Sequence, residues 1–257
     1  MMTEEKKQTG YLSMIFDVQK ANMWKRVSAF LFDAIFICIL AAGFGFLISL
    51  IFGFDAQEEE MQRIYARYES DYGITLDITE AEYAALPEEE KAAFDRAMTA
   101  MEEDETLAAL YRSVVGNSYL TVSLSLFLAF FVLDFLVPLF LGNGQTPGKK
   151  IFGIALMRFD LIRVGKASLF VRAVLGKYAV ETMIPVTVLL MLYFGETGIG
   201  GLVLLGLLLI AQLILFFTSG LNQPIHDKLA ATVAVDYASQ LIFDSPEKKE
   251  VYRLAHE

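Results

Sequence analysis

The stretch from Val27 to Phe54, VSAFLFDAIFICILAAGFGFLISLIFGF, is apolar along almost its whole length. A helix needs about 20 such residues to cross the hydrocarbon core of a bilayer, so this stretch is long enough to span it. A cleavable signal peptide is the competing interpretation, but its apolar core would hold only about 7–15 residues. We therefore expect a transmembrane helix that stays in the protein as an anchor.

Three further apolar runs follow. They extend over Tyr119–Leu141, Ala179–Phe194 and Gly200–Thr218, and the second of these reaches spanning length only if it begins near Leu175. Hydrophobic residues make up 55% of the chain and charged residues 20%, whereas soluble domains average roughly 45–50% and about 25%. The excess of apolar side chains has to face lipid. The predicted fold is an all-α integral membrane protein with four transmembrane helices.

The charges are distributed unevenly along the chain. Between Asp55 and Ser118 there are 17 acidic and 5 basic residues, whereas seven Lys and Arg residues and one Asp lie between Gly142 and Lys177. Basic residues next to transmembrane helices are retained in the cytoplasm. The sequence thus predicts a plasma-membrane protein with both termini in the cytoplasm, a basic cytoplasmic loop and an acidic extracytoplasmic insert.

These patterns divide the chain into segments. They are a cytoplasmic tail (1–24), transmembrane helix 1 (25–54), an acidic helical insert (55–118), transmembrane helix 2 (119–141), a basic cytoplasmic loop (142–170), transmembrane helix 3 (171–195), transmembrane helix 4 (200–218) and a cytoplasmic C-terminal tail (219–257). The link from Gly195 to Ile199 is then a short outer turn.

The acidic insert has the pattern of a soluble amphipathic helical hairpin. Thr79 and Glu82 are spaced as a capping box, in which each side chain bonds the backbone N–H of the other residue. Apolar residues recur at helical spacing between Ala92 and Met101. The insert either binds cations or a basic partner through its acidic face, or simply keeps this loop soluble.

Two carboxylates, Asp33 and Asp134, lie inside predicted transmembrane helices, where an ionisable group indicates a functional site. Asp33 lies seven residues after Arg26, and Asp134 lies seven residues before Leu141, which gives both a depth of roughly 10 Å. Two antiparallel helices therefore present carboxylates at matching depth, which suits binding of a proton or a small cation. Alternatively, Arg26 and Asp33 form a static ion pair that orders helix packing.

Two prolines lie four residues after a carboxylate within predicted helices. Pro138 follows Asp134 and Pro185 follows Glu181, and a helical proline leaves the carbonyl four residues earlier without its usual donor. Carbonyl and carboxylate oxygens together suit a hard cation. Glu181 also follows Lys177 at the spacing of an i,i+4 ion pair, and this is the interpretation that we favour for it.

The loop after the second helix opens with NGQTPGKK, Asn143–Lys150. It lacks the first glycine and the final hydroxyl residue of a phosphate-binding P-loop. Pro147 and Gly148 instead suit the centre of a type II turn, with the two lysines against lipid headgroups. The predicted cytoplasmic turn consists of Gly144, Gln145, Thr146, Pro147, Gly148 and Lys149.

Two short apolar pieces lie on the predicted cytoplasmic side, at residues 151–158 and 232–237. Both are rich in β-branched and aromatic residues. We expect them to pair as a small cytoplasmic two-stranded element.

The sequence does not favour enzymatic or metal chemistry. Cys38 is the only cysteine and lies within the first apolar run, and the two histidines, His226 and His256, are far apart in the C-terminal tail. A zinc site needs several such ligands close together, and His226 next to Asp227 has no placed nucleophile. We expect no enzyme activity, no metal or other cofactor and no nucleic acid partner.

Four segments together resemble the RDD family of small membrane proteins, which is named for one arginine and two aspartates. Arg26 and Asp33 in KRVSAFLFDAI resemble the first arginine and aspartate, and NGQTPGKKIFGIALMR resembles the family's Gly-Gln-Thr-Pro-Gly-Lys segment. LFVRAVL carries a similar Arg172, and HDKLAATVAV carries the second named aspartate at Asp227. The resemblance implies a membrane fold and, because cation/proton antiport is attributed to a member, a transport function. Asp134 is not part of the family pattern.

The leading hypothesis is a proton-coupled transporter of Na⁺, K⁺ or Li⁺. Asp33, together with Asp134, alternately binds a proton and a cation, and Arg26 tunes the carboxylate pKa. Asp227 with His226 lies at the cytoplasmic mouth. The secondary candidates are Glu181, Arg172 and His226.

Two further expectations concern assembly. Transporters usually consist of two repeated halves, and no internal repeat is evident in the sequence, so we expect a homo-oligomer in the lipid bilayer. The rival hypothesis is a non-transporting scaffold or accessory protein that recruits partners through the acidic insert and the basic loop.

Overall fold

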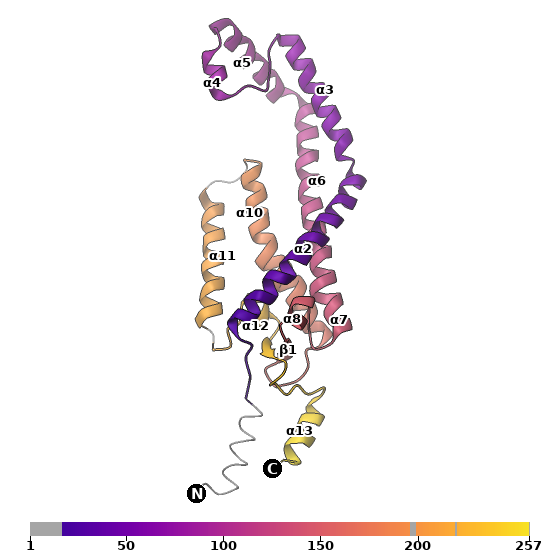
Figure 1. The fold of residues 1–257 in the computed structure, drawn as a ribbon. Coiled ribbons are helices and arrows are strands. Elements are labelled where there is room, and N and C mark those ends of the chain that lie inside the picture. Colours follow the sequence, from indigo (N-terminus) through magenta and orange to yellow (C-terminus); the bar gives the residue numbers. More distant parts are fainter. Residues whose placement is uncertain (1–16, 196–198, 219, 257) are drawn as a thin grey trace. The chain divides into compact units, whose positions relative to one another are not determined.

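The computed structural model describes residues 17–195, 199–218 and 220–256 (Figure 1). Most of the predicted N-terminal tail lies outside the described residues, as do positions 196–198 of the predicted outer turn. The described residues form two compact units, one from the ranges 17–44 and 123–256 and the other from residues 45–122. The first contains the predicted buried carboxylates, and the second contains all of the predicted acidic insert, residues 55–118.

Long apolar helices dominate the chain. They are α2 (Met23–Phe52), the consecutive α6 (Glu105–Phe130), η1 (Phe131–Leu136) and α7 (Val137–Leu141), the consecutive α9 (Lys166–Phe170), η2 (Val171–Met183) and α10 (Ile184–Tyr193), and α11 (Ile199–Thr218). Three continuous helical segments, Met23–Phe52, Glu105–Leu141 and Lys166–Tyr193, are long and apolar enough to cross a membrane, whereas α11 is a shorter apolar helix. The prediction of a helical membrane fold is confirmed in this form.

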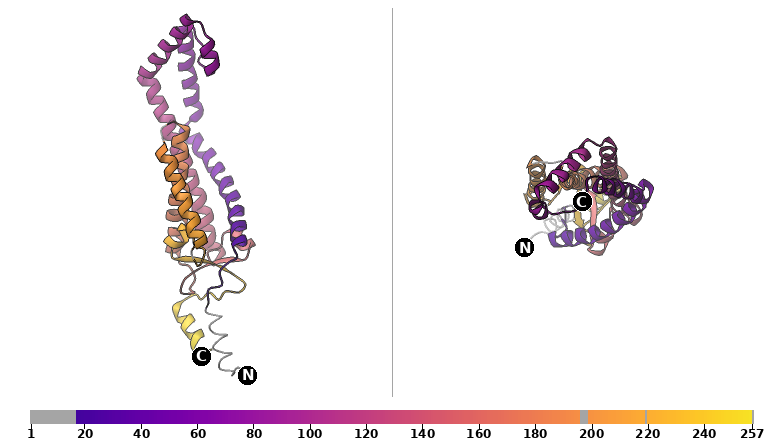
Figure 2. Two further views of the ribbon diagram at one scale, coloured as in Figure 1. Left: turned by 90° about the vertical axis from the view of Figure 1, so that its left-hand side faces the viewer. Right: turned by 90° about the horizontal axis from the view of Figure 1, so that it is seen from above.

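Apolar side chains on these helices point outward. Phe30 and Ile39 on α2 and Leu209 and Leu213 on α11 are each more than half exposed. Soluble proteins rarely present such continuous apolar surfaces to water, so these faces are suited to lipid. The helices α10 and α11 run side by side in both side views (Figures 1 and 2).

Both π-helical segments end two residues before a proline, Pro138 after η1 and Pro185 after η2. Proline has no N–H, and its ring clashes with the carbonyl four residues earlier. At the end of η1 the backbone hydrogen bonding is that of a π-helix, because the N–H of Val137 bonds the carbonyl of Val132, five residues earlier. Such segments recur at functional sites. In this chain η1 contains Asp134 and η2 contains Glu181.

A short helix and a strand follow both α7 and α11. They are α8 (Pro147–Ile151) with β1 (Ile154–Arg158), and α12 (Ile225–Leu229) with β2 (Thr232–Asp236), and α13 (Pro246–Leu254) comes last. The two strands pair antiparallel, with Leu156 opposite Ala234, which confirms the predicted two-stranded element. We call α8, β1, α12 and β2 the polar end of the first unit.

The sheet separates two hydrophobic clusters. Ile154 and Leu156 belong to one, and Ala155 and Met157 belong to the other, because successive side chains of a strand point to opposite faces. All four side chains are fully buried. Packing on both faces therefore determines the register of β1.

The segment NGQTPGKK does not form the predicted type II turn. Thr146 is the N-cap of α8 and accepts the backbone N–H of Lys149 at 3.4 Å, and Pro147 is the first helical residue. Lys149 is only 8% exposed, whereas Lys150 is exposed. The turn prediction was wrong because the backbone angle that proline imposes suits the start of a helix as well as a turn. Lys149 therefore does not lie against lipid headgroups.

The second unit is helical, as predicted for the insert. Its helices are α3 (Phe54–Tyr72), α4 (Glu80–Ala85), α5 (Glu88–Glu103) and the first part of α6. The predicted capping box is confirmed, because the N–H of Thr79 bonds Glu82 Oε2 at 2.8 Å and the N–H of Glu82 bonds Thr79 Oγ1 at 3.3 Å. Ile64, Tyr68 and Leu107 form a small hydrophobic core.

An engineered disulfide tests the register of the sheet. In a Cys38→Ala background, Ala155→Cys with Val235→Cys should form a disulfide on mild oxidation. The two residues lie directly opposite each other, and the Cβ atoms of such pairs are about 4.5–5.5 Å apart. The control pair, Ala155→Cys with Ala234→Cys, points to opposite faces and should keep two free thiols, counted in denaturant. A disulfide in the control pair instead would contradict the register.

Candidate functional site

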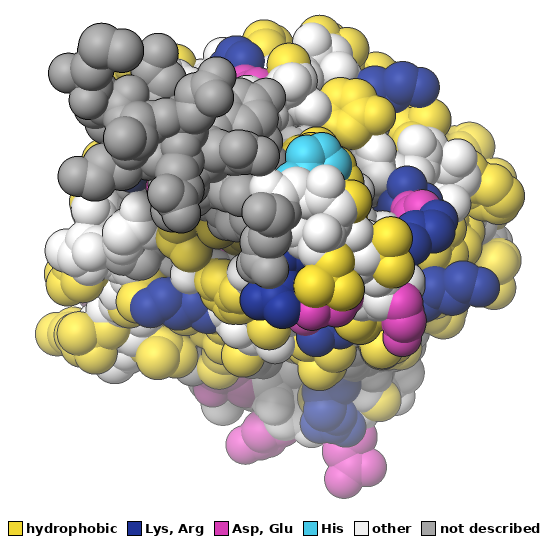
Figure 3. All heavy atoms as spheres, turned by 90° about the horizontal axis from the view of Figure 1, so that it is seen from below, with side chains coloured by type: hydrophobic (Ala, Val, Ile, Leu, Met, Phe, Trp, Pro, Cys, Tyr) yellow, Lys and Arg dark blue, Asp and Glu magenta, His cyan; other side chains and the backbone are white. Residues whose placement is uncertain are grey.

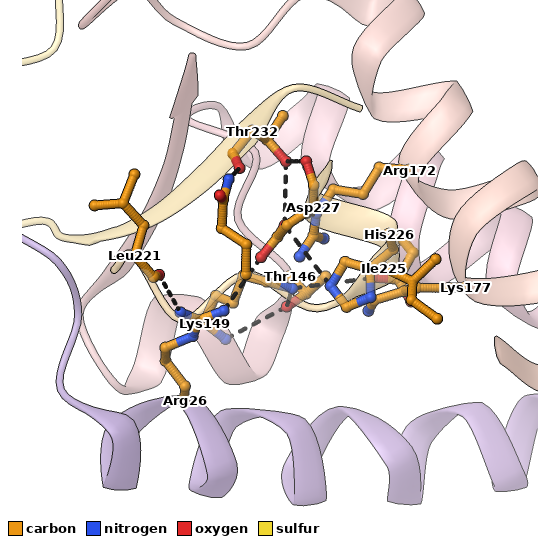
Figure 4. A network of polar contacts seen from close by, with 12 residues as sticks. Arg26, Thr146, Lys149, Arg172, Lys177, Leu221, Ile225, His226, Asp227 and Thr232 are labelled. Carbon is orange, nitrogen blue, oxygen red and sulfur yellow. Dashed lines mark hydrogen bonds and ion pairs between the residues drawn. The ribbon is translucent and has the colours of Figure 1, made fainter. Parts of the chain in front are cut away.

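Charged side chains are buried together where the long helices contact the polar end. They are Asp33 on α2, Asp134 on η1, Lys149 on α8, Arg172 and Lys177 on η2, and Asp227 on α12, and each is less than 10% exposed. Such residues are almost never buried unless they are paired. In Figure 4 the side chains of Arg26, Lys149, Arg172 and Asp227 come from different elements and point toward one another.

The first cluster, which we call the lysine centre, consists of Lys149, Lys177, Thr146, Asp33 and Asp134. The Lys149 Nζ lies 3.7 Å from Asp33 Oδ2 and 3.9 Å from Asp134 Oδ1. It also donates to Thr146 Oγ1 at 3.0 Å, and this hydroxyl donates to Asp33 Oδ2 at 2.5 Å. Lys177 donates to Asp134 Oδ1. The two predicted carboxylates thus share the ammonium group of Lys149.

A close helix contact assembles the lysine centre. The N–H of Gly148 donates to Asp33 Oδ1 at 2.8 Å. A Cβ atom on Gly148 would lie 2.4 Å from the carbonyl oxygen of Ala29, so only glycine lets α8 approach α2 this closely. The same contact brings Thr146 and Lys149 beside Asp33.

One oxygen atom of the lysine centre is unpaired. Asp134 is 2% exposed, and its Oδ2 atom has no hydrogen-bond partner among the residues that the structure describes. A buried polar atom without a partner costs free energy. This atom is therefore a favourable place for a proton, a water molecule or a cation.

The second cluster, which we call the aspartate centre, consists of Asp227 between Arg26 and Arg172. Asp227 is 0% exposed. Its Oδ2 lies 3.1 Å from Arg26 Nη2, and its Oδ1 lies 2.8 Å from Arg172 Nε. Thr232 Oγ1 donates to Oδ1 at 3.1 Å, and Arg26 also donates to the Leu221 carbonyl at 3.3 Å (Figure 4). Two guanidinium groups therefore hold one carboxylate.

Glu181 on η2 and His226 on α12 form a third buried contact. The backbone N–H of His226 donates to Glu181 Oε1 at 2.9 Å, and its Nδ1 lies 2.7 Å from Oε2. The helices touch closely here, because a Cβ atom on Gly176 would lie 2.5 Å from the Cβ of His226. This contact holds α12 against η2.

The predicted pairing of Arg26 with Asp33 is wrong. The ion pair that Arg26 makes within the described chain is with Asp227, and Asp33 is bound by α8. The reason is that α8 and α12 insert between the long helices and supply partners of their own. The sequence assigns both short helices to loops outside the helix bundle.

The predicted pairing of Lys177 with Glu181 is also wrong. Lys177 bonds Asp134, and Glu181 bonds His226. Both residues find partners on other elements, Lys177 on η1 and Glu181 on α12. The i,i+4 rule describes only contacts within one helix, so it does not include these partners.

The sequence analysis missed the roles of Lys149 and Lys177. It treated both as lysines at the membrane interface, although a buried carboxylate needs a cation within reach. Two carboxylates inside predicted helices were therefore a signal to look for two buried lysines or arginines. Nothing in the sequence indicates which of the basic residues these would be.

A cavity of about 230 Å³ adjoins all three contacts. Its lining includes Arg26, Asp33, Lys149, Arg172, Glu181 and His226. Phe30 on α2 and Leu213 on α11 also line it, and both are more than half exposed. The cavity thus has charged groups on one part of its wall and apolar groups from two long helices on another.

The short helices carry groups with shifted pKa values. Burial lowers the pKa of Lys149 to about 7, the positive charges of Lys177 and Arg172 add to the effect, and the two carboxylates of the lysine centre oppose it. Burial alone would raise the pKa of Asp227, but Arg172 holds it well below its usual value. Burial lowers the pKa of His226. Near neutral pH, Lys149 is therefore the group in this set that gains and loses a proton most readily.

This geometry defines a class of protein, a helical membrane protein whose apolar helices enclose a network of buried ion pairs at one end. The chain belongs to the RDD family, whose model matches residues 20–231. The match includes the lysine centre and the aspartate centre. Comparison with curated proteins and with solved structures found no match.

The first prediction for the site concerns stability. Asp227→Asn leaves two buried guanidinium groups without a carboxylate, and breaking a buried ion pair costs about 3–5 kcal/mol of unfolding free energy. The matched control is Asp236→Asn, which removes the partner of the more exposed Lys25 and should cost less than about 1 kcal/mol. Denaturant titration in mixed micelles measures both. An equal loss of unfolding free energy in the two variants would show that the aspartate centre stabilises the fold no more than the exposed ion pair does.

The second prediction concerns pH. Lys149 has a pKa of about 7 in the folded protein against an ordinary lysine pKa of 10.5, so between these values the unfolded chain binds the extra proton. The free energy of unfolding should therefore rise with pH from about 7 to about 10, by at most about 1.4 kcal/mol per pH unit from this group. Lys149→Met should flatten the rise, whereas Lys150→Met should leave it intact. A flat profile in the wild type would contradict the lowered pKa.

Proposed function

We propose that this RDD-family protein exchanges a monovalent cation for a proton at the lysine centre. The observation that carries the proposal is the position of the Lys149 ammonium group, 3.7 Å from Asp33 and 3.9 Å from Asp134. Both carboxylates are buried in the membrane-spanning helices. The space between the two carboxylates holds one positive charge, either that of the protonated Lys149 or that of a bound cation.

Charge balance couples the two ions. With Lys149 protonated, the two lysines of the lysine centre compensate Asp33 and Asp134, so that the centre is neutral. Loss of the Lys149 proton leaves one net negative charge, which is costly in a low-dielectric site. Binding of one Na⁺, K⁺ or Li⁺ restores neutrality. One proton therefore leaves as one cation enters.

The lysine centre offers oxygen ligands for the incoming cation. Hard cations prefer carboxylate, hydroxyl and water oxygens. Asp134 Oδ2 is buried and lacks a hydrogen-bond partner among the described residues, and the Thr146 hydroxyl lies beside Asp33. Deprotonation reduces the number of hydrogen bonds that Lys149 donates, which frees the Thr146 hydroxyl oxygen for the cation.

The surface of the polar end supports a cytoplasmic orientation in the plasma membrane. Lys and Arg side chains lie among hydrophobic ones on this face (Figure 3). Lys25, Lys150 and Lys228 are exposed, and Trp24 is exposed beside Lys25. Basic residues and tryptophan are enriched at the cytoplasmic interface of membrane proteins. In this orientation the lysine centre lies on the cytoplasmic side of the helices.

Exchange in proteoliposomes tests the proposal. Purified protein is reconstituted with an imposed pH gradient and a pH-sensitive dye, and Na⁺, K⁺ or Li⁺ is added. Lys149→Arg keeps the positive charge between the carboxylates, but arginine holds its proton up to a pKa above about 12. We therefore expect Lys149→Arg to slow exchange by at least about a hundredfold. Asp33→Asn and Asp134→Asn should also abolish it.

The control is Lys150→Arg, the same change at the exposed neighbouring lysine, which should exchange cations like the wild type. Size-exclusion chromatography shows whether each variant is folded. Exchange that persists in Lys149→Arg overturns the proposal. Absence of exchange in folded, reconstituted wild type also overturns it and leaves the ion pairs as static contacts, as the scaffold hypothesis expects.

A further inference from the structure

The polar end contains a structural repeat. Gln145–Arg158 and Gln223–Asp236, which lie 78 residues apart, run through the same elements in the same order. In each, the amide of the first glutamine donates to the carbonyl that begins the strand, at 2.9 Å in one segment and 2.7 Å in the other. Between the glutamine and the strand, each segment has a five-residue helix followed by one residue with positive φ. This residue is Gly153 in the first segment and Ala231 in the second.

A twofold axis relates the two segments. The equivalent residues Leu156 and Ala234 lie directly opposite each other in the antiparallel sheet, so a twofold rotation about an axis through this pair exchanges the strands. The chain just before α2 forms a bridge to β2, and the chain just before α9 forms the corresponding bridge to β1. The symmetry therefore extends from the strands to the starts of the long helices.

The long helices repeat the same contact with the short helices. Asp33 on α2 accepts the N–H of Gly148 at 2.8 Å, and Glu181 on η2 accepts the N–H of the equivalent His226 at 2.9 Å. The glycine contact between the helices lies four residues before the carboxylate in α2, at Ala29, and five residues before it in η2, at Gly176. This difference matches the wider turn of a π-helix. Glu181 thus accepts the hydrogen bond that corresponds to the one Asp33 accepts.

The two segments carry opposite charges at two pairs of equivalent positions, Arg158 with Asp236 and the buried Lys149 with Asp227. Lys149 occupies the position in α8 that Asp227 occupies in α12. Lys149 lies between two carboxylates, whereas Asp227 lies between two guanidinium groups. The repeats are therefore similar in backbone and opposite in charge at their centres.

With the preceding long helices included, the two repeats extend over residues 20–158 and 163–236, and the cavity lies where they meet. Asp33 and Lys149 from the first repeat line it together with Arg172 and Glu181 from the second. Both repeats begin and end at the polar end, which makes them parallel repeats. In transporters of this kind the substrate binds at the interface of the repeats.

We propose that the chain is an internal duplication, and that the cavity between its repeats binds the transported cation through Glu181 as well as Asp33. This inference rests on the function proposed above. The cavity of about 230 Å³ has room for about seven water molecules at about 30 Å³ each. A monovalent cation that keeps part of its hydration shell fits this space. Two such halves in one chain also remove the reason to expect an oligomer.

Protection of cysteines from a thiol reagent tests the cavity without measuring transport. In a Cys38→Ala background, Val27→Cys and Leu213→Cys line the cavity and should react with a small cationic methanethiosulfonate. The control Leu209→Cys is exposed on α11 outside the cavity lining and should react slowly from lipid, because thiolate formation needs water. Na⁺ at about ten times its dissociation constant should slow the two cavity reactions about tenfold.

Removing the charge of the second carboxylate separates binding from anchoring. Glu181→Gln keeps an oxygen acceptor for the N–H of His226, so that α12 stays in place, and it should abolish protection by Na⁺ as Asp33→Asn does. Asp160→Asn, a carboxylate outside the cavity lining, should keep full protection.

Each outcome decides between the proposals. Protection that persists in Glu181→Gln shows that Glu181 only anchors α12 and overturns the inference. If Na⁺ does not protect the cavity cysteines in the protein that keeps Glu181, the inference is overturned as well. This result does not depend on whether Glu181→Gln folds. Exchange in proteoliposomes without protection leaves the proposed function standing and removes only the inference. Protection without exchange supports the cation site and contradicts the proposed function.

Discussion

The close approach of α8 to α2 at Gly148 is the contact on which the polar end depends. A side chain at this position would overlap the carbonyl oxygen of Ala29, and α8 would have to withdraw. Thr146 and Lys149 would leave with it, and Asp33 would lose its donors. A buried carboxylate without donors or a cation is too costly to keep ionised. The packing of one glycine thus sets the electrostatics of the lysine centre.

Much of the fold is readable from local sequence patterns. Apolar length identifies the long helices, and the β-branched pieces at residues 151–158 and 232–237 identify the two strands. The spacing of Thr79 and Glu82 identifies a capping box. These features depend on residues close together in the chain, where period and spacing carry the information. Hydropathy alone leaves open whether the shorter helix α11 spans the membrane.

The pairing within the site is not readable in the same way. It depends on short helices of five residues that re-enter between long ones, and a segment of that length has no periodicity to recognise. The contact of Lys177 with Asp134 joins two helices, η2 and η1, and the i,i+4 rule describes only pairs within one helix. The repeat is hidden for a related reason. Its two halves share backbone bonds, but they carry opposite charges at Lys149 and Asp227.

The pairing of Leu156 with its own counterpart Ala234 bears on how such a chain can evolve. A dimer of two identical half-length chains has the same residue at both central positions, so it carries two lysines or two aspartates there. Fusion into one chain lets each position mutate alone, and a lysine and an aspartate can then coexist. It also lets one copy gain an insertion, such as the helices α3, α4 and α5, that the other lacks. Duplication followed by divergence thus gives a symmetric scaffold a difference in charge between its two halves that two identical subunits cannot have.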